Sequence, residues 1–224
     1  AENLNHSISL FNTNRRLIEE IYNIRQEYPW RLSAVDTYHI IRAGLSIPVE
    51  EHNQILEDVI EVISEERGEP MDNIRVVING SFCEQPPIGL IRSIEMAGCY
   101  IVDDDFMLGS RWIQGDVDAT TDDPIGALVD AYLTKSTFSS AVYDVGNHKG
   151  KRLVKLVRER NADGVIFSAA SFCDPALLDK PELQKECDAV GIPHINFQYH
   201  ENTGQFKVIK EQAGTFSDSI KLWA

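Results

Sequence analysis

Four short apolar segments recur from residue 74 onward, and each is separated from the next by enough sequence for a helix. The segments are IRVVING at 74–80, CYIVD at 99–103, GVIFS at 164–168 and IPHINF at 192–197. Short runs that do not alternate with polar residues are typical of strands buried on both faces. Because neighbouring parallel strands require helix-length crossovers, this pattern predicts a doubly wound parallel sheet with helices on both sides.

Amphipathic segments with capping residues predict helices around these strands. Three precede the first strand, at 4–28, 33–43 and 48–67, and the others are expected at 87–97, 124–133, 149–160, 181–190 and 203–222. Proline opens several of these segments and glycine closes several, as is usual at helix ends. We therefore expect an α/β fold of the Rossmann or flavodoxin type over residues 73–224, preceded by a helical segment over residues 1–72.

The composition limits the classes of function. The chain is 43% hydrophobic, which is enough for a core, but no apolar stretch approaches the ~18 residues of a membrane span and no signal-peptide core is present. With 21 basic against 35 acidic residues the net charge is -14, which argues against nucleic acid as a partner. The phosphate-binding patterns GxGxxG and GxxxxGKS/T are absent. These features favour a cytoplasmic protein that binds neither nucleic acid nor membrane.

Two similar loops follow the first and third predicted strands, with Ser-Phe-Cys-Glu at 81–84 and Ser-Phe-Cys-Asp at 171–174. Ligands bind at the carboxyl edge of parallel sheets, where such loops meet. A thiol there could bind a metal, attack an electrophile or contact a ligand, and a plain structural role for Cys83 and Cys173 is an equal alternative. Cys99 and Cys187 fall inside a predicted strand and helix, so they are expected to be buried structural residues.

Acidic and histidine side chains offer further chemistry. Asp103, Asp104 and Asp105 end the second strand, where they could bind a hard cation or supply a base. Acidic residues also commonly cap helices and line polar loops, which is the simpler alternative. The histidines lack the spacing of a zinc hydrolase. His194 or His200 could serve a cysteine nucleophile only if the fold brings one of them to the thiol.

Three segments together resemble the benzoyl-CoA reductase and 2-hydroxyacyl-CoA dehydratase family: GSFCEQPP at 80–87, AGCYIVDDD at 97–105 and SFCDP at 171–175. The resemblance runs over the whole chain, and the CEQPP and DDD segments are closer to benzoyl-CoA reductase subunits. Family members have two Rossmann-like halves, and this chain resembles the second half of an active-site subunit. Because it begins with Ala1, we expect a fragment or processed product that lacks the upstream cluster-binding half.

The resemblance implies an iron–sulfur site. Each active-site subunit of the family typically holds a four-iron four-sulfur cluster through three cysteines, and the motif that supplies one of them matches Cys173. The other two ligands belong to the half that this sequence lacks, so the chain alone is expected to be cluster-free and inactive. Cys83 is not an assigned family ligand, but its loop is expected to border the cluster or the substrate.

The resemblance also implies a reaction and partners, of the kind used in anaerobic aromatic degradation. In the family, an ATP-hydrolysing iron–sulfur activator delivers a low-potential electron that forms a ketyl radical on a coenzyme A thioester. Two homologous active-site subunits form a heterodimer. Reduction of benzoyl-CoA is the first hypothesis, and a 2-hydroxyacyl-CoA dehydratase subunit and a non-catalytic binding or cluster-assembly protein are the alternatives. Glu84, Asp103 and His200 are candidate proton carriers that the sequence does not rank.

Overall fold

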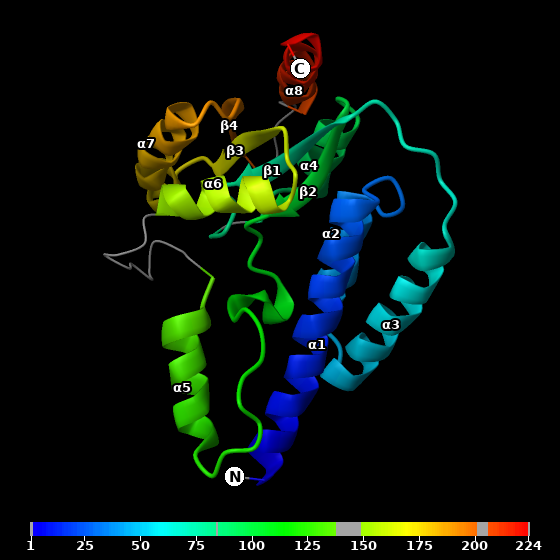
Figure 1. Ribbon diagram of the computed structural model, residues 1–224, viewed down its shortest axis with the longest axis vertical. Coiled ribbons are helices and arrows are strands. Elements are labelled where there is room, and N and C mark those ends of the chain that lie inside the picture. Colours follow the sequence, from blue (N-terminus) through cyan, green and yellow to red (C-terminus); the bar gives the residue numbers. More distant parts are fainter. Residues whose placement is uncertain (1, 84, 138–148, 201–205, 224) are drawn as a thin grey trace.

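The fold is built on a four-stranded sheet in which each pair of neighbouring strands is parallel (Figure 1). The computed structural model describes residues 2–83, 85–137, 149–200 and 206–223. The strands are β1 (Ile74–Asn79), β2 (Cys99–Asp104), β3 (Gly164–Ala170) and β4 (His194–Tyr199), in the spatial order β2-β1-β3-β4. The predicted doubly wound α/β fold, with helices ahead of the sheet, is confirmed.

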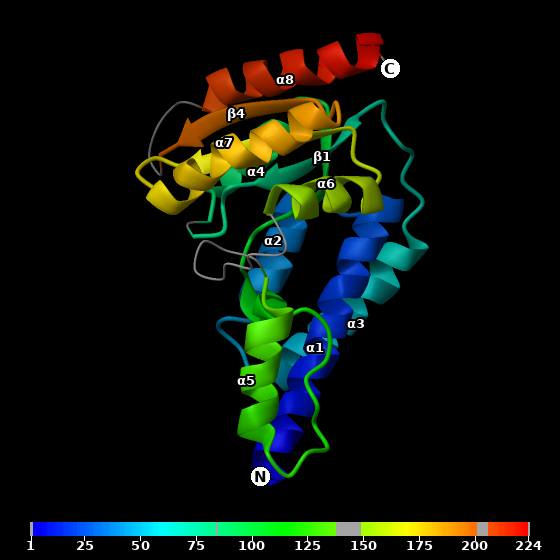
Figure 2. The same ribbon diagram turned by 60° about the vertical axis from the view of Figure 1, so that its left-hand side comes forward.

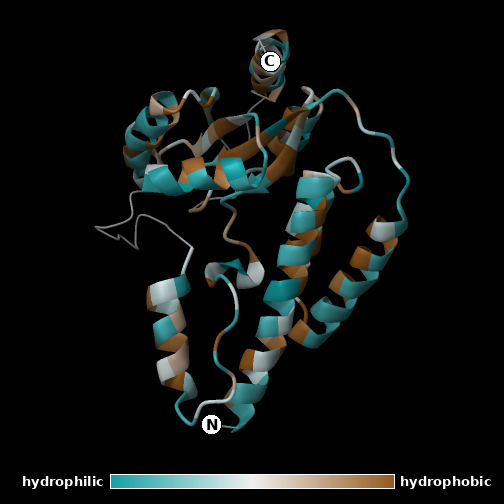
Figure 3. Cartoon of the chain, in the orientation of Figure 1, coloured by the Kyte–Doolittle hydropathy of each residue, from teal (hydrophilic) through white to brown (hydrophobic). Residues whose placement is uncertain are grey.

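Helices cover both faces of this sheet. The described helices are α1 (Glu2–Glu27), α2 (Ala34–Ala43), α3 (Val49–Glu65), α4 (Ile88–Glu95), α5 (Pro124–Lys135), α6 (Lys149–Glu159), α7 (Asp174–Ala189) and α8 (Phe206–Trp223). Strand residues alternate between the faces: Val76 and Ile78 pack with residues of α4 and α8, whereas Val77 packs with residues of α6 and α7. Hydrophobic residues accordingly gather on the strands in Figure 3, because a parallel sheet is buried on both sides.

The leading helices share a hydrophobic core with the sheet. Figures 1 and 2 show α1, α2 and α3 together beneath the sheet, with α5 beside the N-terminal part of α1. Ile21 and Tyr22 of α1 belong to the same buried cluster as Ile78 of β1, and Ile8 packs with Ala131 of α5. The helical segment is therefore anchored to the sheet, and the division into residues 1–72 and 73–224 stays a prediction.

None of the described helices has the length and apolar character that a membrane crossing requires. Helix α6 is strongly amphipathic, and hydrophilic residues dominate its outer surface in Figure 3. Its buried positions are Leu153, Val154 and Val157, at helical spacing, beside the close-packed Gly150. This arrangement is typical of a helix that covers one face of a sheet.

The start of α7 differs from the sequence-based expectation. The helix begins at Asp174, well before the predicted start at Pro181, which lies inside the helix. Pro175 occupies the first turn, where the missing N–H group has no partner to lose, so local pattern alone fits either proline. Because the helix starts early, Cys173 directly precedes it.

The loop after β2 contains a short 3-10 helix, η1 (Gly109–Trp112). Thr203, the predicted cap of the last helix, lies outside the described residues.

Gly80, at the end of β1, is required by both its backbone conformation and the space around it. Its φ is +106°, and a Cβ atom there would lie 3.0 Å from the carbonyl oxygen of Ser168. We expect Gly80→Ala to lower the free energy of unfolding by roughly 1–3 kcal/mol in urea denaturation. Gly115→Ala is the matched control, because Gly115 has a φ of +75° but no atom within 4 Å of its Cβ position. Equal losses in the two variants would contradict a steric role for Gly80.

Candidate functional site

The topological switch point of the sheet lies between β1 and β3. The chain leaves β1 for β2 on one side, and from β2 it returns past β1 to reach β3 on the other side. Open parallel sheets bind ligands outside the carboxyl ends of the strands at this point. Cys83 follows β1 and Cys173 follows β3, so the two similar loops flank the switch point. The expectation that both loops reach one edge of the sheet is confirmed.

An acidic side chain from the end of β2 holds the loop that carries Cys83. The Asp105 carboxylate accepts hydrogen bonds from the backbone N–H groups of Gly80, at 2.6 Å, and of Ser81, at 3.0 Å. The Ser81 hydroxyl donates to the carbonyl oxygen of Ser168 in β3, at 2.7 Å. Contacts from β2 and β3 therefore fix the first residues of this loop.

The pKa of Asp105 provides a test of the burial of its carboxyl group. Burial raises the pKa from 3.8 to about 7, against the opposing effect of the two backbone hydrogen bonds. Between these values the native state binds more protons than the unfolded state, so the free energy of unfolding falls as pH rises, by at most about 1.4 kcal/mol per pH unit. Asp105→Asn cannot ionise. As pH rises from about 4 to 7.5, the urea midpoint of this variant should therefore fall less steeply than that of the wild type. Equal slopes in the two proteins would contradict a raised pKa of Asp105.

The loop that carries Cys173 is short and strained. The Cys173 N–H group donates to the carbonyl oxygen of Ala170 at 3.1 Å. Phe172 has a φ of +69°, which bulky residues rarely adopt, and its side chain is 90% exposed. The Ser171 hydroxyl lies 3.0 Å from Nε2 of His200, and the His200 and Phe172 rings lie 6.2 Å apart. His200 is thus a neighbour of the cysteine loop.

The two cysteine side chains at the switch point interact with each other. Partial desolvation by the surrounding protein raises the pKa of the Cys83 thiol to about 11, and the charge of Cys173 and a hydrogen bond with it act in the same direction. Cys83 is exposed and Cys173 is half-buried, and both are free thiols. Cys99 and Cys187 are buried in β2 and α7, as predicted. The strand order therefore brings together two thiols that are far apart in the sequence.

A cleft opens beside this edge of the sheet. Its volume is about 810 Å³, which is comparable to the sites of small organic ligands. Phe82 and Ala176 line it close to the two cysteine loops, and residues of α1 and α6 form other parts of its wall. The lining contains both basic and acidic side chains, among them Arg15, Lys155 and Asp105. The cleft gives a polar or charged ligand access to the switch point.

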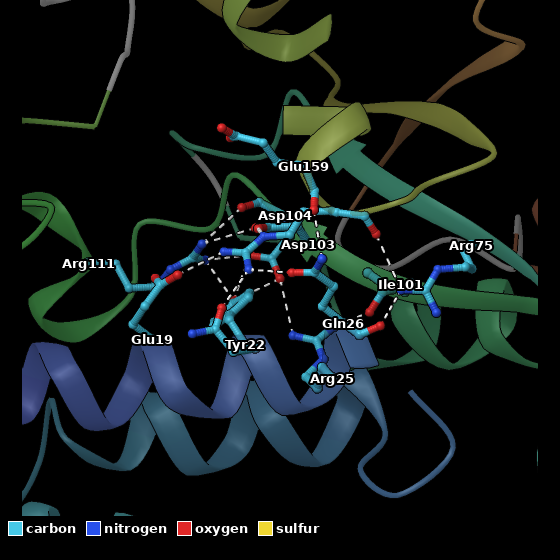
Figure 4. Close-up of polar contacts among 12 residues, drawn as sticks. Glu19, Tyr22, Arg25, Gln26, Arg75, Ile101, Asp103, Asp104, Arg111 and Glu159 are labelled. Carbon is cyan, nitrogen blue, oxygen red and sulfur yellow. Dashed lines mark hydrogen bonds and ion pairs between the residues drawn. The ribbon is translucent and has the colours of Figure 1, made fainter. Parts of the chain in front are cut away.

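Asp104 lies in a buried network between α1 and β2 (Figure 4). Its carboxylate accepts hydrogen bonds from the Tyr22 hydroxyl, at 2.8 and 2.9 Å, and from Arg111, at 2.5 Å. Nη1 of Arg25 lies 3.6 Å away, and the Arg25 side chain is only 1% exposed. The same arginine donates to the carbonyl oxygen of Ile101. This carboxylate therefore compensates buried positive charge.

Asp103 belongs to the same network. It is paired with Nε of Arg160 at 2.6 Å and with Arg111 at 3.4 Å. Burial raises the pKa of Asp103, and the two guanidinium groups act in the opposite direction. Among the residues that the structure describes, no group of three or more His, Cys, Asp or Glu side chains is arranged to hold a metal. The hard-cation interpretation of the aspartate triplet has no support there.

The structure separates the candidate proton carriers from one another. His200 lies at the Cys173 loop, whereas Asp103 is buried among arginines. Glu84 lies outside the described residues. His194, the other histidine considered for a nucleophile, begins β4 at the opposite edge of the sheet and is paired with Asp188 at 3.0 Å. The proton-carrier roles stay predictions, and of the two candidates that the structure describes, His200 and Asp103, His200 is the one beside the Cys173 loop.

Sequence reasoning missed the roles of Asp105, Arg111 and Phe172. By sequence alone, Asp105 is treated together with Asp103 and Asp104. In the structure β2 ends at Asp104, so Asp105 lies outside the strand. Arg111 had no local signal, because its partners on α1 and β2 are distant in the sequence. The one available signal for Phe172 was the repetition of Ser-Phe-Cys in both loops.

Fold and site together define a doubly wound α/β protein with paired cysteine loops at its switch point. The family model described as 2-hydroxyglutaryl-CoA dehydratase, D-component, matches residues 1–220. The chain therefore belongs to this family, and the resemblance inferred from its motifs is confirmed.

Curated relatives place the chain within that family. It is 50% identical to a benzoyl-CoA reductase subunit of Thauera aromatica over 222 residues, which cover 99% of this chain and 57% of that protein. It is 22% identical to the (R)-phenyllactyl-CoA dehydratase beta subunit of Clostridium sporogenes, over 98% of this chain and 57% of the relative. It is 25% identical to the beta subunit of lactoyl-CoA dehydratase of Anaerotignum propionicum, over 97% of this chain and 57% of that relative. The chain thus spans a little over half the length of these relatives.

Proposed function

We propose that this chain is part of the iron–sulfur active-site subunit of an ATP-driven aryl-CoA reductase that acts on benzoyl-CoA. The observation that carries the proposal is the difference in sequence identity, which is 50% to a benzoyl-CoA reductase subunit against 22% and 25% to two dehydratase subunits over nearly the same region. The reaction is therefore proposed from the relative with the higher overall identity.

Cys173 is the proposed cluster ligand, and the donor chemistry of the switch point supports it. Iron–sulfur clusters are held by cysteine thiolates, and two thiols, Cys83 and Cys173, interact at this edge. A four-iron cluster takes more protein ligands than these two thiols. The remaining ligands are therefore proposed to lie outside this chain, which covers 57% of the reductase subunit, and the chain alone is expected to be inactive. Cys83 ranks below Cys173 as a ligand.

The cluster, when bound, would supply low-potential electron transfer to the coenzyme A thioester, chemistry that amino-acid side chains do not provide. The residues of this chain would orient the acyl group in the cleft and hold a proton carrier close to it. His200 is the preferred carrier, since it is in hydrogen-bond range of Ser171 beside the cysteine loop. Asp103 ranks lower because its carboxylate is already paired with arginines.

The proposed partners are a homologous active-site subunit, in a heterodimer, and an ATP-dependent iron–sulfur activator. The names of the relatives support a multi-subunit assembly, because each is designated as a subunit. A 2-hydroxyacyl-CoA dehydratase subunit is the second candidate, and the family description and the two dehydratase relatives favour it.

An assay with two substrates distinguishes these candidates. Full-length protein, assembled with its partner subunit and activator without oxygen, is given either benzoyl-CoA or lactoyl-CoA together with ATP and a reductant. We expect ATP-dependent ring reduction of benzoyl-CoA and no loss of water from lactoyl-CoA. Water loss without ring reduction would overturn the reductase assignment in favour of the dehydratase. Absence of both activities together with absence of iron would favour a non-catalytic binding or cluster-assembly protein.

A further inference from the structure

The two cysteine loops begin on neighbouring strands that are hydrogen-bonded to each other. They follow β1 and β3, which are adjacent parallel strands, and the Ser81 hydroxyl at the start of one loop donates to the Ser168 carbonyl of the other strand at 2.7 Å. The strands approach so closely that a Cβ atom at Gly80 would lie 3.0 Å from the same carbonyl oxygen. The loops that carry Cys83 and Cys173 therefore leave the sheet from neighbouring strands whose ends are tied together.

All four cysteines lie in the part of the chain that the structure describes, and no other pair of them is arranged in this way. Cys99 is buried at the amino end of β2, at the opposite edge of the sheet from the two loops. Cys187 is buried near the C-terminal end of α7 and packs in the cluster on the other face of the sheet. Cys83 and Cys173, by contrast, interact with each other, and neither is fully buried. A small reagent can reach this pair from solvent.

We propose that Cys83 and Cys173 form a reversible disulfide when no metal holds Cys173. The oxidant is a low-molecular-weight disulfide. One cysteine thiolate attacks a sulfur of the oxidant, forms a mixed disulfide and releases one small thiol. The second cysteine thiolate then attacks the protein sulfur of the mixed disulfide, forms the bond between the two loops and releases the second small thiol. The protein loses two protons and two electrons, and the oxidant is reduced to two thiols.

The disulfide has a consequence for metal binding. A sulfur atom in a disulfide has no thiolate to offer, so the oxidised chain could not bind a cluster through Cys173 until a thiol reductant restored it. Formation of the disulfide is independent of the proposed iron–sulfur function, whereas this consequence rests on that function. The geometry thus points to a redox-sensitive site at which cluster assembly and disulfide formation exclude each other.

The test uses the reduced chain of residues 1–224, incubated without oxygen with oxidised glutathione, then unfolded, alkylated and digested without reductant. Mass spectrometry should find two of the four cysteines protected from alkylation and a linked pair of peptides that contains Cys83 and Cys173. Dithiothreitol should restore four alkylated cysteines. Stable glutathione adducts on either residue without the linked pair, a bond between two chains, or four reactive thiols after oxidation would each overturn the proposal.

Single substitutions give matched controls. Cys83→Ser should accumulate a glutathione adduct on Cys173, because the second attack has lost its nucleophile. Cys187→Ala should still form the linked pair. Failure of the disulfide is separable from failure of the proposed function, since cluster content is measured on full-length protein that was never oxidised. A linked pair in the chain, together with full iron content in full-length Cys173→Ser protein, would keep the disulfide and reject the cluster assignment.

Discussion

Full-length protein carrying Cys173→Ser, purified with its partner subunit and without oxygen, should lose most of its iron and acid-labile sulfide. A serine hydroxyl is nearly the size of the thiol but is a much poorer ligand for the soft iron–sulfur cluster. We expect a serine at this position to preserve the local structure. The side chain is only half-buried, and the backbone N–H group can still donate to the carbonyl oxygen of Ala170. Iron and sulfide per protein molecule, with the visible absorbance, measure the effect.

Two further variants sharpen this experiment. Cys187→Ala changes a buried cysteine of the helix that follows Cys173, away from the sheet edge, and should keep its iron even if the protein becomes less stable. Cys83→Ser should also keep most of its iron if Cys83 is a neighbour and not a ligand. Equal loss of iron in the Cys83 and Cys173 variants would make both thiols ligands, and full iron content in Cys173→Ser would reject the assignment.

Asp104→Ala should strongly destabilise the chain, by about 3–5 kcal/mol, without touching the cysteine loops. The substitution removes the carboxylate that lies 3.6 Å from Arg25 and 2.5 Å from Arg111. Arg25 is almost completely buried and would keep its charge, although its nearest ion-pair partner would be gone. The Ile101 carbonyl, the Tyr22 ring at 4.9 Å and the charge of Glu95 would remain as weaker compensation. An uncompensated buried charge costs far more than a lost surface ion pair, so urea denaturation should show a large fall in the free energy of unfolding.

A surface pair provides the control for this prediction. Arg16, also on α1, lies 2.6 Å from Asp116, but both side chains are about half exposed. Asp116→Ala should therefore cost less than about 1 kcal/mol, because solvent screens such a pair. Tyr22→Phe should fall between the two, since it removes the hydroxyl that bonds to Asp104 and leaves the arginines paired. Similar losses for Asp104→Ala and Asp116→Ala would contradict the role assigned to the buried network.

Much of the fold could be predicted because it depends on local patterns. The β-branched run that begins at Ile74 and the buried run that begins at Gly164 form strands where the pattern predicted them. Ser33 caps α2 through the backbone N–H of Asp36, as its position before the helix suggested. The predicted start of α7 was wrong, because Pro175 and Pro181 both fit the first turn of a helix and the sequence pattern placed the start at the second of them.

The candidate site could be predicted only in part. Cys83 and Cys173 were identified because each follows a strand, and parallel strands end at one edge. The sequence could not predict the partner of each polar group. Asp103 is an example, because one of its arginine partners comes from the loop after β2 and the other from the end of α6. Nothing in the spacing of acidic residues distinguishes a carboxylate that binds a cation from one that neutralises buried guanidinium groups.

The sequence by itself determined the alternation of strands and helices, the two cysteine loops at strand ends and the family to which the motifs belong, because these are properties of contiguous residues. The tertiary structure alone decided that the strand order is β2-β1-β3-β4, which makes the two thiols neighbours. It also decided that Asp105 clamps the Cys83 loop and that Asp104 neutralises Arg25. These pairings join residues from separate elements, and they form only when the helices pack against the sheet and exclude water from the groups between them.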